Sequence, residues 1–149
     1  MRIALFQPDI PQNTGNIIRL AACLDVAVDI IKPTGFFLDD KKFRRSAMDY
    51  LKYAKIKEHR DWDSFFKWSA KNRYRIVLFT TKGKKDYLDH RYQQNDILLF
   101  GRESAGVPEK VHKNAKVRLI IPIQKKLRSL NVSSSVAIAL SEGMRQSRR

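Results

Sequence analysis

Short apolar runs alternate with helical patterns along the chain, and this alternation constrains the fold more than any other feature of the sequence. The predicted strands cover residues 2–7, 26–31, 55–58, 75–80, 96–100 and 119–123. The predicted helices cover residues 17–24, a segment opened by Asp39 and Asp40, residues 61–70, a short turn begun by Pro108, and a final helix from Val132. Such alternation predicts one α/β domain over residues 1–149, with a mostly parallel sheet covered by helices on both faces.

The charge of the chain is strongly positive, with 30 Lys and Arg against 15 Asp and Glu and a formal net charge of +15. An excess of this size predicts a polyanionic partner, the alternative being a surplus that only aids solubility. Basic residues gather in two stretches: residues 41–60, which include Arg44 and Arg45, and the segment around Lys125 and Arg128. We expect both stretches to contact the phosphates of a nucleic acid.

Several classes of protein do not fit the sequence. No apolar run reaches the about 20 residues that a membrane-spanning helix needs, so we expect no membrane segment. The single cysteine, Cys23, suits a reducing cytosol, and we expect it to be buried on an apolar helix face. His59, His90 and His112 lie far apart without acidic or thiol partners at ligand spacing, so we expect no metal site. The glycines match neither a dinucleotide fingerprint nor a Walker phosphate loop.

Three loops that each follow a predicted strand are the candidates for a binding site. They cover residues 79–83, 101–108 and 121–131. Open α/β sheets bind ligands outside the carboxyl ends of their strands, so these loops can meet at one edge. Gly101 allows the backbone to approach a ligand closely, while Ser129 and Asn131 offer side-chain hydrogen bonds. Asn131 is also the predicted N-cap of the final helix. Ordinary turns and a cap are the alternative for each of these residues taken singly.

The loop after the first strand brings amides close to an arginine. Asn13, Thr14, Asn16 and Arg19 place two amides, a hydroxyl and a guanidinium within about one and a half turns of a helix start. Arg19 shares a helix face with Asn16. Pro8 and Pro11 stiffen the approach to this segment. Amides clustered beside an arginine predict recognition of phosphate or ribose, the alternative being an arginine that only faces solvent.

Together the loops carry three motifs similar to those of the SpoU-type SPOUT RNA methyltransferases, and the likeness covers nearly the whole chain in order. The motifs are Pro11-x-Asn13-Thr14-Gly15-Asn16-Ile17-x-Arg19, then Phe100-Gly101-x-Glu103-x-x-Gly106-x-Pro108, then Ile121-Pro122 with Arg128-Ser129-Leu130-Asn131-x-Ser133-x-Ser135-Val136-Ala137. Gly35-Phe36 before Asp39-Asp40-Lys41 most resembles the TrmL branch, which 2′-O-methylates the wobble nucleotide of certain leucine tRNAs. The chain departs from the pattern at Arg102, where a proline is common, and at Ser141, where a tyrosine is common.

The resemblance implies an α/β fold with a C-terminal trefoil knot. It implies that S-adenosylmethionine (AdoMet) is bound in the knot by residues matching Phe79, Gly101, Ile121, Ser129 and Leu130. It also implies a homodimer with the site near the interface, where Asn13 and Arg19 of one subunit face the AdoMet of the other. Arg19 and Asn131 are the implied catalytic residues, and Asn13 is an implied RNA contact.

Family accounts assign proton acceptance to the arginine matching Arg19. A guanidinium has a pKa of about 12.5 or higher, so we expect Arg19 to orient the ribose hydroxyl or a neighbouring phosphate, with the proton passing to phosphate or water. We therefore predict a cytoplasmic, metal-free, AdoMet-dependent enzyme that methylates the 2′-hydroxyl of a cytidine or modified uridine at the wobble position of a tRNA, namely tRNA-Leu. The alternatives are the same chemistry on another RNA, a non-catalytic RNA-binding protein of the same fold, and a small-molecule methyltransferase, against which the charge argues.

Overall fold

The structure, a computed structural model, describes residues 1–147. Its strands are β1 (Arg2–Phe6), β2 (Ala27–Ile31), β3 (Ile56–His59), β4 (Arg75–Phe79), β5 (Lys85–Asp86), β6 (Asp96–Phe100) and β7 (Val117–Ile120). Its helices are α1 (Pro11–Cys23), α2 (Lys41–Ala47), α3 (Trp62–Lys71), α4 (Glu109–Asn114) and α5 (Val132–Ser147), with 3₁₀ turns η1 (Met48–Tyr53) and η2 (Tyr87–Asp89). No helix within these residues is both long and apolar enough to cross a membrane.

The strands form one sheet in the order β3-β2-β1-β6-β4-β7-β5, and every neighbouring pair is parallel. The central strands are nearly continuous apolar runs; all five residues of β6, for example, are buried. Strands consist of continuous apolar residues when helices cover the sheet on both sides, because neither face then contacts water. The predicted parallel α/β sheet is therefore confirmed.

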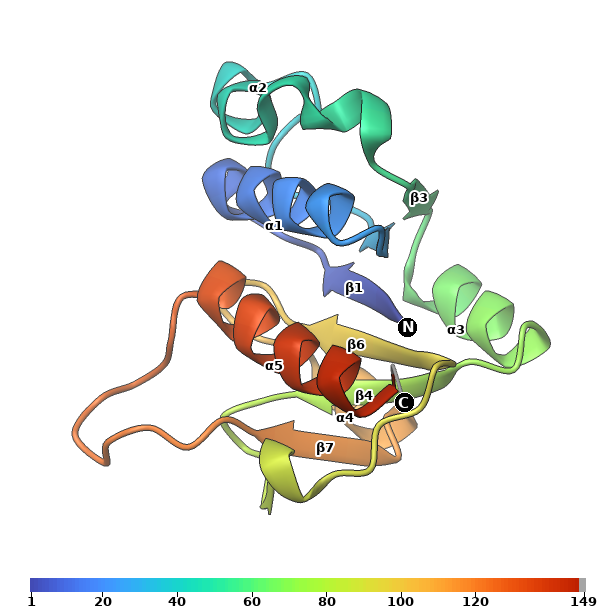
Figure 1. Ribbon diagram of the computed structural model, residues 1–149, viewed down its shortest axis with the longest axis vertical. Helices are drawn as coiled ribbons and strands as arrows, with labels where there is room; N and C mark the ends of the chain where they lie inside the picture. The colour runs from blue at the N-terminus through green and yellow to red at the C-terminus, as the bar shows by residue number, and fades with distance from the viewer. Residues whose placement is uncertain (148–149) are drawn as a thin grey trace.

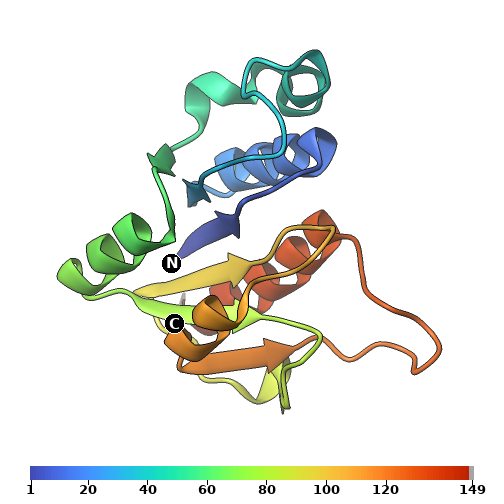
Figure 2. The same cartoon turned by 180° about the vertical axis from the view of Figure 1, so that it is seen from behind.

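Successive residues of the strands β1, β4 and β6 contribute to two separate cores. Ile3 and Leu5 pack on the face that α1, α2 and α5 cover, while Ala4 and Phe6 pack on the face that α3 and α4 cover. Figures 1 and 2 show these helix layers from opposite sides. The alternation follows from the pleat of a strand, which points neighbouring side chains to opposite faces. Helices on both faces are thus confirmed.

The chain changes direction in the sheet at β1. It runs outward from β1 to β2 and β3, and later returns to place β6 on the other side of β1. The loops that follow β1 and β6 therefore leave the carboxyl edge side by side. In open α/β sheets this is the position where a crevice for ligands opens.

Two fully buried aspartates, Asp29 and Asp96, are each paired with an arginine. Arg2 donates to both carboxylate oxygens of Asp29 at 2.7 and 3.0 Å. Arg75 donates to both oxygens of Asp96 at 2.6 and 2.8 Å. Burying a carboxylate is costly unless it is paired and hydrogen-bonded. Both carboxylates thus have structural partners within the sheet.

The structure differs from the sequence predictions at several positions. Helix α1 begins at Pro11 rather than Ile17, because proline fits the first turn, where its missing N–H is not needed. Cys23 is exposed and not buried as predicted: it is two residues past the buried Ala21, which turns it to the opposite side of α1. Strand β7 lies at Val117–Ile120, earlier than the predicted residues 119–123.

Candidate functional site

Three loops converge on a cavity of about 530 Å³ at the carboxyl edge of the sheet. They follow β6, β4 and β7, which are neighbours in the sheet, so their carboxyl ends lie side by side. All five residues predicted to bind a cofactor line the cavity: Phe79, Gly101, Ile121, Ser129 and Leu130. The volume is within the range of about 300–1,000 Å³ typical of small-molecule sites. The predicted convergence of the three loops is confirmed.

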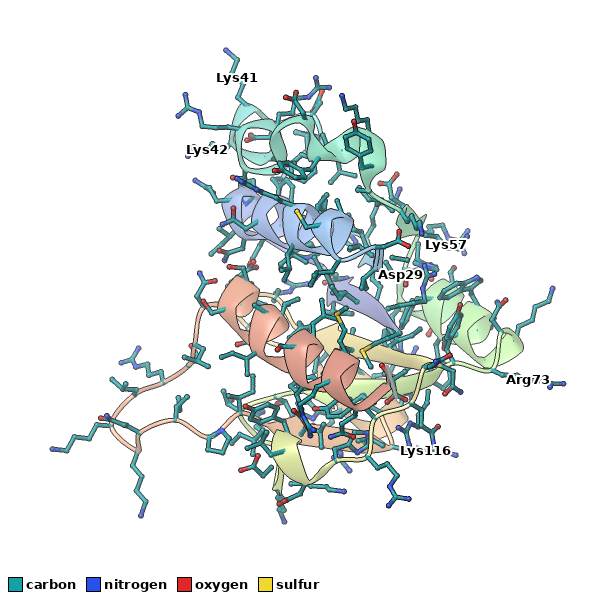
Figure 3. The ribbon with its side chains drawn as sticks, viewed as in Figure 1. Asp29, Lys41, Lys42, Lys57, Arg73 and Lys116 are labelled. Atoms are coloured by element: carbon teal, nitrogen blue, oxygen red, sulfur yellow. The ribbon has the colours of Figure 1, made fainter. Side chains whose placement is uncertain are left out.

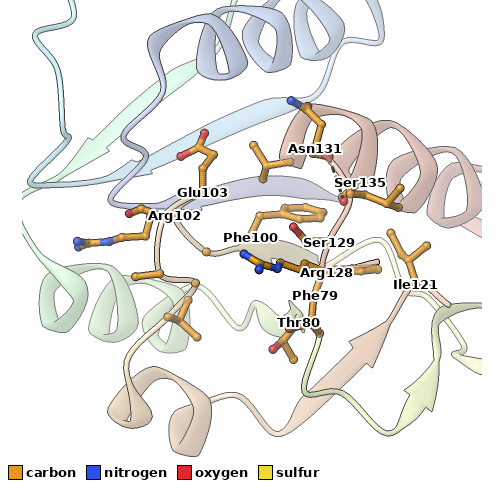
Figure 4. A pocket seen from close by; sticks show the side chains of 18 of the residues that line it. Phe79, Thr80, Phe100, Arg102, Glu103, Ile121, Arg128, Ser129, Asn131 and Ser135 are labelled. Atoms are coloured by element: carbon orange, nitrogen blue, oxygen red, sulfur yellow. Dashed lines mark hydrogen bonds between the residues drawn. The ribbon is translucent and has the colours of Figure 1, made fainter. Parts of the chain in front are cut away.

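One part of the cavity wall is apolar and flat. The rings of Phe79 and Phe100 stack with their centroids 5.0 Å apart and an interplanar angle of 14°. These residues end the adjacent strands β4 and β6 and are paired in register, which places the rings on the same face of the sheet. Ile121 extends the apolar lining from the third loop (Figure 4), and Leu130 of the same loop also lines the cavity. An apolar wall of this kind suits a planar heteroaromatic ring.

The loop after β6 is closed by a pair of backbone hydrogen bonds. Arg102 and Gly106 exchange N–H···O bonds of 3.1 and 2.9 Å. A Cβ at Gly101 would lie 2.5 Å from the carbonyl carbon of Gly106, and Gly106 itself has a φ of +62°. Gly101 therefore has no space for a side chain, and the left-handed backbone at Gly106 favours glycine.

Asn131 caps helix α5 and also reaches across to α1. Its Oδ1 accepts from the backbone N–H groups of Ser133 at 2.9 Å and Ser134 at 3.4 Å, as predicted for an N-cap. Its amide nitrogen donates to Oδ1 of Asn13 at 3.0 Å. The cap thereby fixes the side chain of Asn131, and Asn131 in turn fixes that of Asn13, which is 7% exposed.

Asn13 continues this network to a pair of carboxylates. Its amide donates to Oε1 of Glu103 at 3.3 Å. The backbone N–H of Asp9 donates to Glu103 Oε2 at 3.0 Å, and the backbone N–H of Glu103 donates to Asp9 Oδ1 at 3.2 Å. The Ser104 hydroxyl also donates to Asp9. One hydrogen-bonded network thus joins all three motif-bearing segments.

The pKa values of the two carboxyl groups, Glu103 and Asp9, are shifted in opposite directions. Burial, and next the hydrogen bond with Asp9, raises the pKa of Glu103 above its usual value. The hydrogen bond from Glu103 is the main cause that lowers the pKa of Asp9; burial opposes it, and the hydrogen bond from Ser104 adds to the lowering. Like charges this close cannot both ionise freely, so Glu103 holds a proton to higher pH than Asp9 does.

The predicted RNA contacts lie in different places. Asn13 and Arg128 line the cavity of their own chain. That Asn13 also faces the AdoMet of a partner subunit stays a prediction. Arg44 and Arg45 are exposed on α2, and Lys125 is exposed on the loop before α5. Figure 3 shows α2 above the sheet, with Lys41 and Lys42 at its outer end.

Arg19, the predicted catalytic arginine, is exposed on α1 and is not among the residues that line the cavity of its own chain. Its guanidinium carbon lies 4.8 Å from the centroid of the Tyr50 ring. A guanidinium stacked on an aromatic ring is restricted in orientation, which favours a defined planar contact over a mobile charge.

Sequence reasoning did not identify Asp9 as part of the site, and it gave no role to Glu103 within its motif. The signal was weak, because a single acidic residue in a loop has many ordinary uses. Within the described part of the chain, no group of three or more His, Cys, Asp or Glu side chains is arranged to hold a metal ion.

Comparison with known proteins supplies independent information. A sequence profile of the SpoU rRNA methylase family matches residues 1–141. A protein of Beijerinckia indica subsp. indica named tRNA (cytidine(34)-2'-O)-methyltransferase is 47% identical over 144 residues, which cover 97% of this chain and 90% of that protein.

Two solved structures share the fold over almost all of the chain. One, from work on the 2-OH methylation of C/U34 on tRNA, matches with a TM-score of 0.92 and 35% identity, covering 97% of this chain and 94% of that one. The other is the SpoU methyltransferase AviRb of Streptomyces viridochromogenes in complex with the cofactor AdoMet. It matches with a TM-score of 0.90 and 24% identity, covering 98% of this chain and 57% of that one.

Proposed function

Since the chain belongs to the SpoU rRNA methylase family, we propose that it methylates the ribose 2′-hydroxyl of the wobble nucleotide of a tRNA, using AdoMet as the methyl donor. The observation that carries this proposal is the cavity at the carboxyl edge. Its walls come from the loops after β4, β6 and β7 together, and it is lined by Phe79, Gly101, Ile121, Ser129 and Leu130.

The chemistry of this cavity fits AdoMet. The stacked Phe79 and Phe100 rings and the side chain of Ile121 offer an apolar surface for adenine. Ser129 supplies a polar group for the ribose. When bound, AdoMet supplies a methyl group activated by a sulfonium.

The residues of the chain act chiefly by positioning. In the reaction, a bond forms between the ribose oxygen and the methyl carbon while the bond from that carbon to sulfur breaks, and the hydroxyl proton leaves to phosphate or water. Asn131, held by its capping bonds and by Asn13, orients the incoming ribose. Arg19, stacked on Tyr50, orients the hydroxyl or a neighbouring phosphate. Positioning of this kind can supply about 7–11 kcal/mol of the barrier reduction.

The proposal extends to the organisation of the protein. We take residues 1–149 as one catalytic domain with a trefoil knot near its C-terminus, working as a homodimer in the cytoplasm, where tRNA is found. α5 leaves Ala137 and Ile138 exposed, which supports a contact with a second copy. In that dimer, Arg19 acts on the site of the partner subunit.

The basic surfaces of the protein fit an RNA substrate. Arg44 and Arg45 on α2, with Lys125 and Arg128 on the loop before α5, would contact phosphates of the anticodon stem-loop. The net charge of +15 supports a polyanionic substrate over a small molecule.

The decisive experiment maps 2′-O-methyl groups in total tRNA from cells with and without the protein. We expect the wobble methylation of one or a few tRNAs, with tRNA-Leu as the first candidate, to disappear without it. Loss of methylation in another RNA would reassign the substrate. Unchanged methylation together with no AdoMet binding by calorimetry would indicate a non-catalytic RNA-binding protein instead.

A further inference from the structure

Phe37 is the most exposed of the large apolar side chains that the structure describes, with 82% of its surface accessible. It lies between β2 and α2, in a segment that the proposed chemistry does not use. Its neighbours Phe36 and Leu38 are instead partly buried and pack against the core beneath α1 and α2. The loop therefore holds two apolar side chains inward and presents the third to solvent.

The loop that carries Phe37 is held firmly from both sides. The ring of Phe36 lies 5.8 Å from that of Phe43 on α2, and the Thr34 hydroxyl donates to the Phe36 carbonyl at 2.6 Å. On the α2 side, the backbone N–H of Asp40 donates to the Phe37 carbonyl at 2.9 Å. An exposed aromatic ring on an anchored loop has little backbone freedom to lose on binding, which favours a contact role.

The surroundings of Phe37 are positively charged. Exposed basic side chains follow it on α2: Lys41, Lys42, Arg44 and Arg45. Of the two intervening acidic residues, Asp40 is engaged as a cap, accepting from the Lys42 N–H at 2.8 Å. An aromatic side chain beside cations is the arrangement with which proteins hold single-stranded nucleic acid, because bases stack on the ring while the cations contact phosphates.

The Phe37 loop also lies next to the proposed active site. The backbone N–H of Gly35 donates to the Pro8 carbonyl at 2.9 Å, and a Cβ at Gly35 would lie 2.6 Å from that of Asp9. Asp9 in turn exchanges hydrogen bonds with Glu103, which lines the cavity. Phe37 is only two residues from Gly35, a span of at most about 7 Å. A nucleotide adjacent to the one in the active site can therefore reach it.

We propose that Phe37 is a stacking platform for an unpaired base of the RNA substrate, next to the nucleotide whose ribose is methylated. This inference rests on the proposed function and deepens it: the enzyme recognises its target within a single-stranded loop. Stacking tolerates any base, because every base presents a π face. Phe37 thus contributes affinity and register, while discrimination among sequences comes from other contacts.

The test compares Phe37→Ala, Phe37→Trp and the control Leu88→Ala, which removes another exposed apolar side chain far from this loop in the sequence. The substrate is an anticodon stem-loop RNA with 2-aminopurine at either nucleotide beside the target. Methylation kinetics are measured with AdoMet, and 2-aminopurine fluorescence reports stacking. Because Phe37 is exposed, melting temperatures should match that of the unchanged protein.

We expect Phe37→Ala to raise KM for the RNA by about 5- to 100-fold, with kcat and AdoMet affinity unchanged. We also expect it to abolish the quenching of 2-aminopurine fluorescence that stacking on Phe37 causes when the RNA binds. Phe37→Trp should keep both properties, and Leu88→Ala should match the unchanged protein. Equal KM values for Phe37→Ala and the unchanged protein would overturn the proposal. The proposal would also be overturned if Phe37→Ala lost only the binding of anionic phospholipid vesicles and kept its binding of RNA. A change in the oligomeric state of the Phe37→Ala protein would overturn it as well. If the unchanged protein methylates no RNA, the proposed function itself fails, a result distinct from these.

Discussion

The side-chain amide of Asn131 donates a hydrogen bond of 3.0 Å to Oδ1 of Asn13, which joins residues 118 positions apart in the chain. The same Asn131 side chain caps α5 through its oxygen. One residue therefore carries two separable tasks: it stabilises a helix with its oxygen and aligns the site with its nitrogen.

Asn131→Asp should separate these tasks. Aspartate keeps the capping oxygen, so the melting temperature should stay close to that of the unchanged protein. It loses the donor to Asn13, so we expect kcat to fall by about 10- to 100-fold. Ser133→Ala, which removes a neighbouring hydroxyl without touching Asn13, is the control. Normal turnover of Asn131→Asp would show that the bond to Asn13 has no catalytic role.

Gly101→Ala should weaken AdoMet binding more than Gly106→Ala. The new Cβ of Gly101→Ala meets the Gly106 backbone at 2.5 Å, so the loop must move. At Gly106 nothing lies within 4 Å, and the cost is the left-handed backbone alone, about 1–2 kcal/mol of stability. Calorimetry should show more than about tenfold weaker AdoMet binding for Gly101→Ala. Equal affinities for the two variants would contradict this order.

Arg19→Lys tests whether a planar contact is needed. Lysine keeps the charge but loses the guanidinium plane that stacks 4.8 Å from the centre of Tyr50. We expect kcat to fall by about 10²-fold with AdoMet affinity unchanged. Near-normal turnover of Arg19→Lys would exclude a two-pronged orienting contact.

The basic surfaces should determine how RNA binding depends on salt. Each lost phosphate contact should reduce the slope of log K against log salt by about 0.7–0.9. We expect this reduction for the double variant Arg44→Gln/Arg45→Gln in tRNA titrations across a range of KCl concentrations. Lys116→Gln should leave the slope unchanged, because Lys116 directly precedes β7 and thus lies at the amino edge of the parallel sheet, away from the cavity. Equal slopes for the double variant and the unchanged protein would remove α2 from the RNA interface.

The stability of the fold should decline in mild acid because of His90. Burial, and next the Arg75 guanidinium, lowers the pKa of His90 below its usual value of 6.5. The unfolded chain therefore binds a proton at a higher pH than the folded one. The contribution of neutral His90 to the free energy of unfolding is fully present above about pH 6.5 and is lost as pH falls. The loss is about 1.4 kcal/mol for each unit by which the pKa of His90 differs between the folded and unfolded states. Urea unfolding between pH 8 and pH 5 should show a flatter profile for His90→Gln; parallel profiles would be evidence against this assignment.

Much of the scaffold follows from local sequence. Strands such as β4 and β6 are predictable because burial on both faces leaves only apolar residues, and the cap at Asn131 is predictable because asparagine satisfies free N–H groups at a helix start. The same logic places the three cavity loops after strands. The roles of individual cavity residues stay predictions for the experiments above.

Other features depend on contacts that no local pattern encodes. The first turn of α1 buries Asn13, Thr14 and Gly15, and apolar periodicity cannot detect a helix turn without apolar residues. Strand β5 has only two residues, both of them charged. The pairing of Asp9 with Glu103 requires β1 to lie beside β6, and strand order is a property of the whole sheet.

The third wall of the cavity is made from residues 121–131, which are synthesised after every strand of the sheet. A nascent chain can therefore assemble most of its scaffold while still lacking a place for the methyl donor. Enzymatic competence therefore arises only after residues 121–131 have been synthesised. Calorimetry on a chain ending at Ile123 should accordingly detect no binding heat with AdoMet, so that prematurely terminated products neither sequester the donor nor modify RNA.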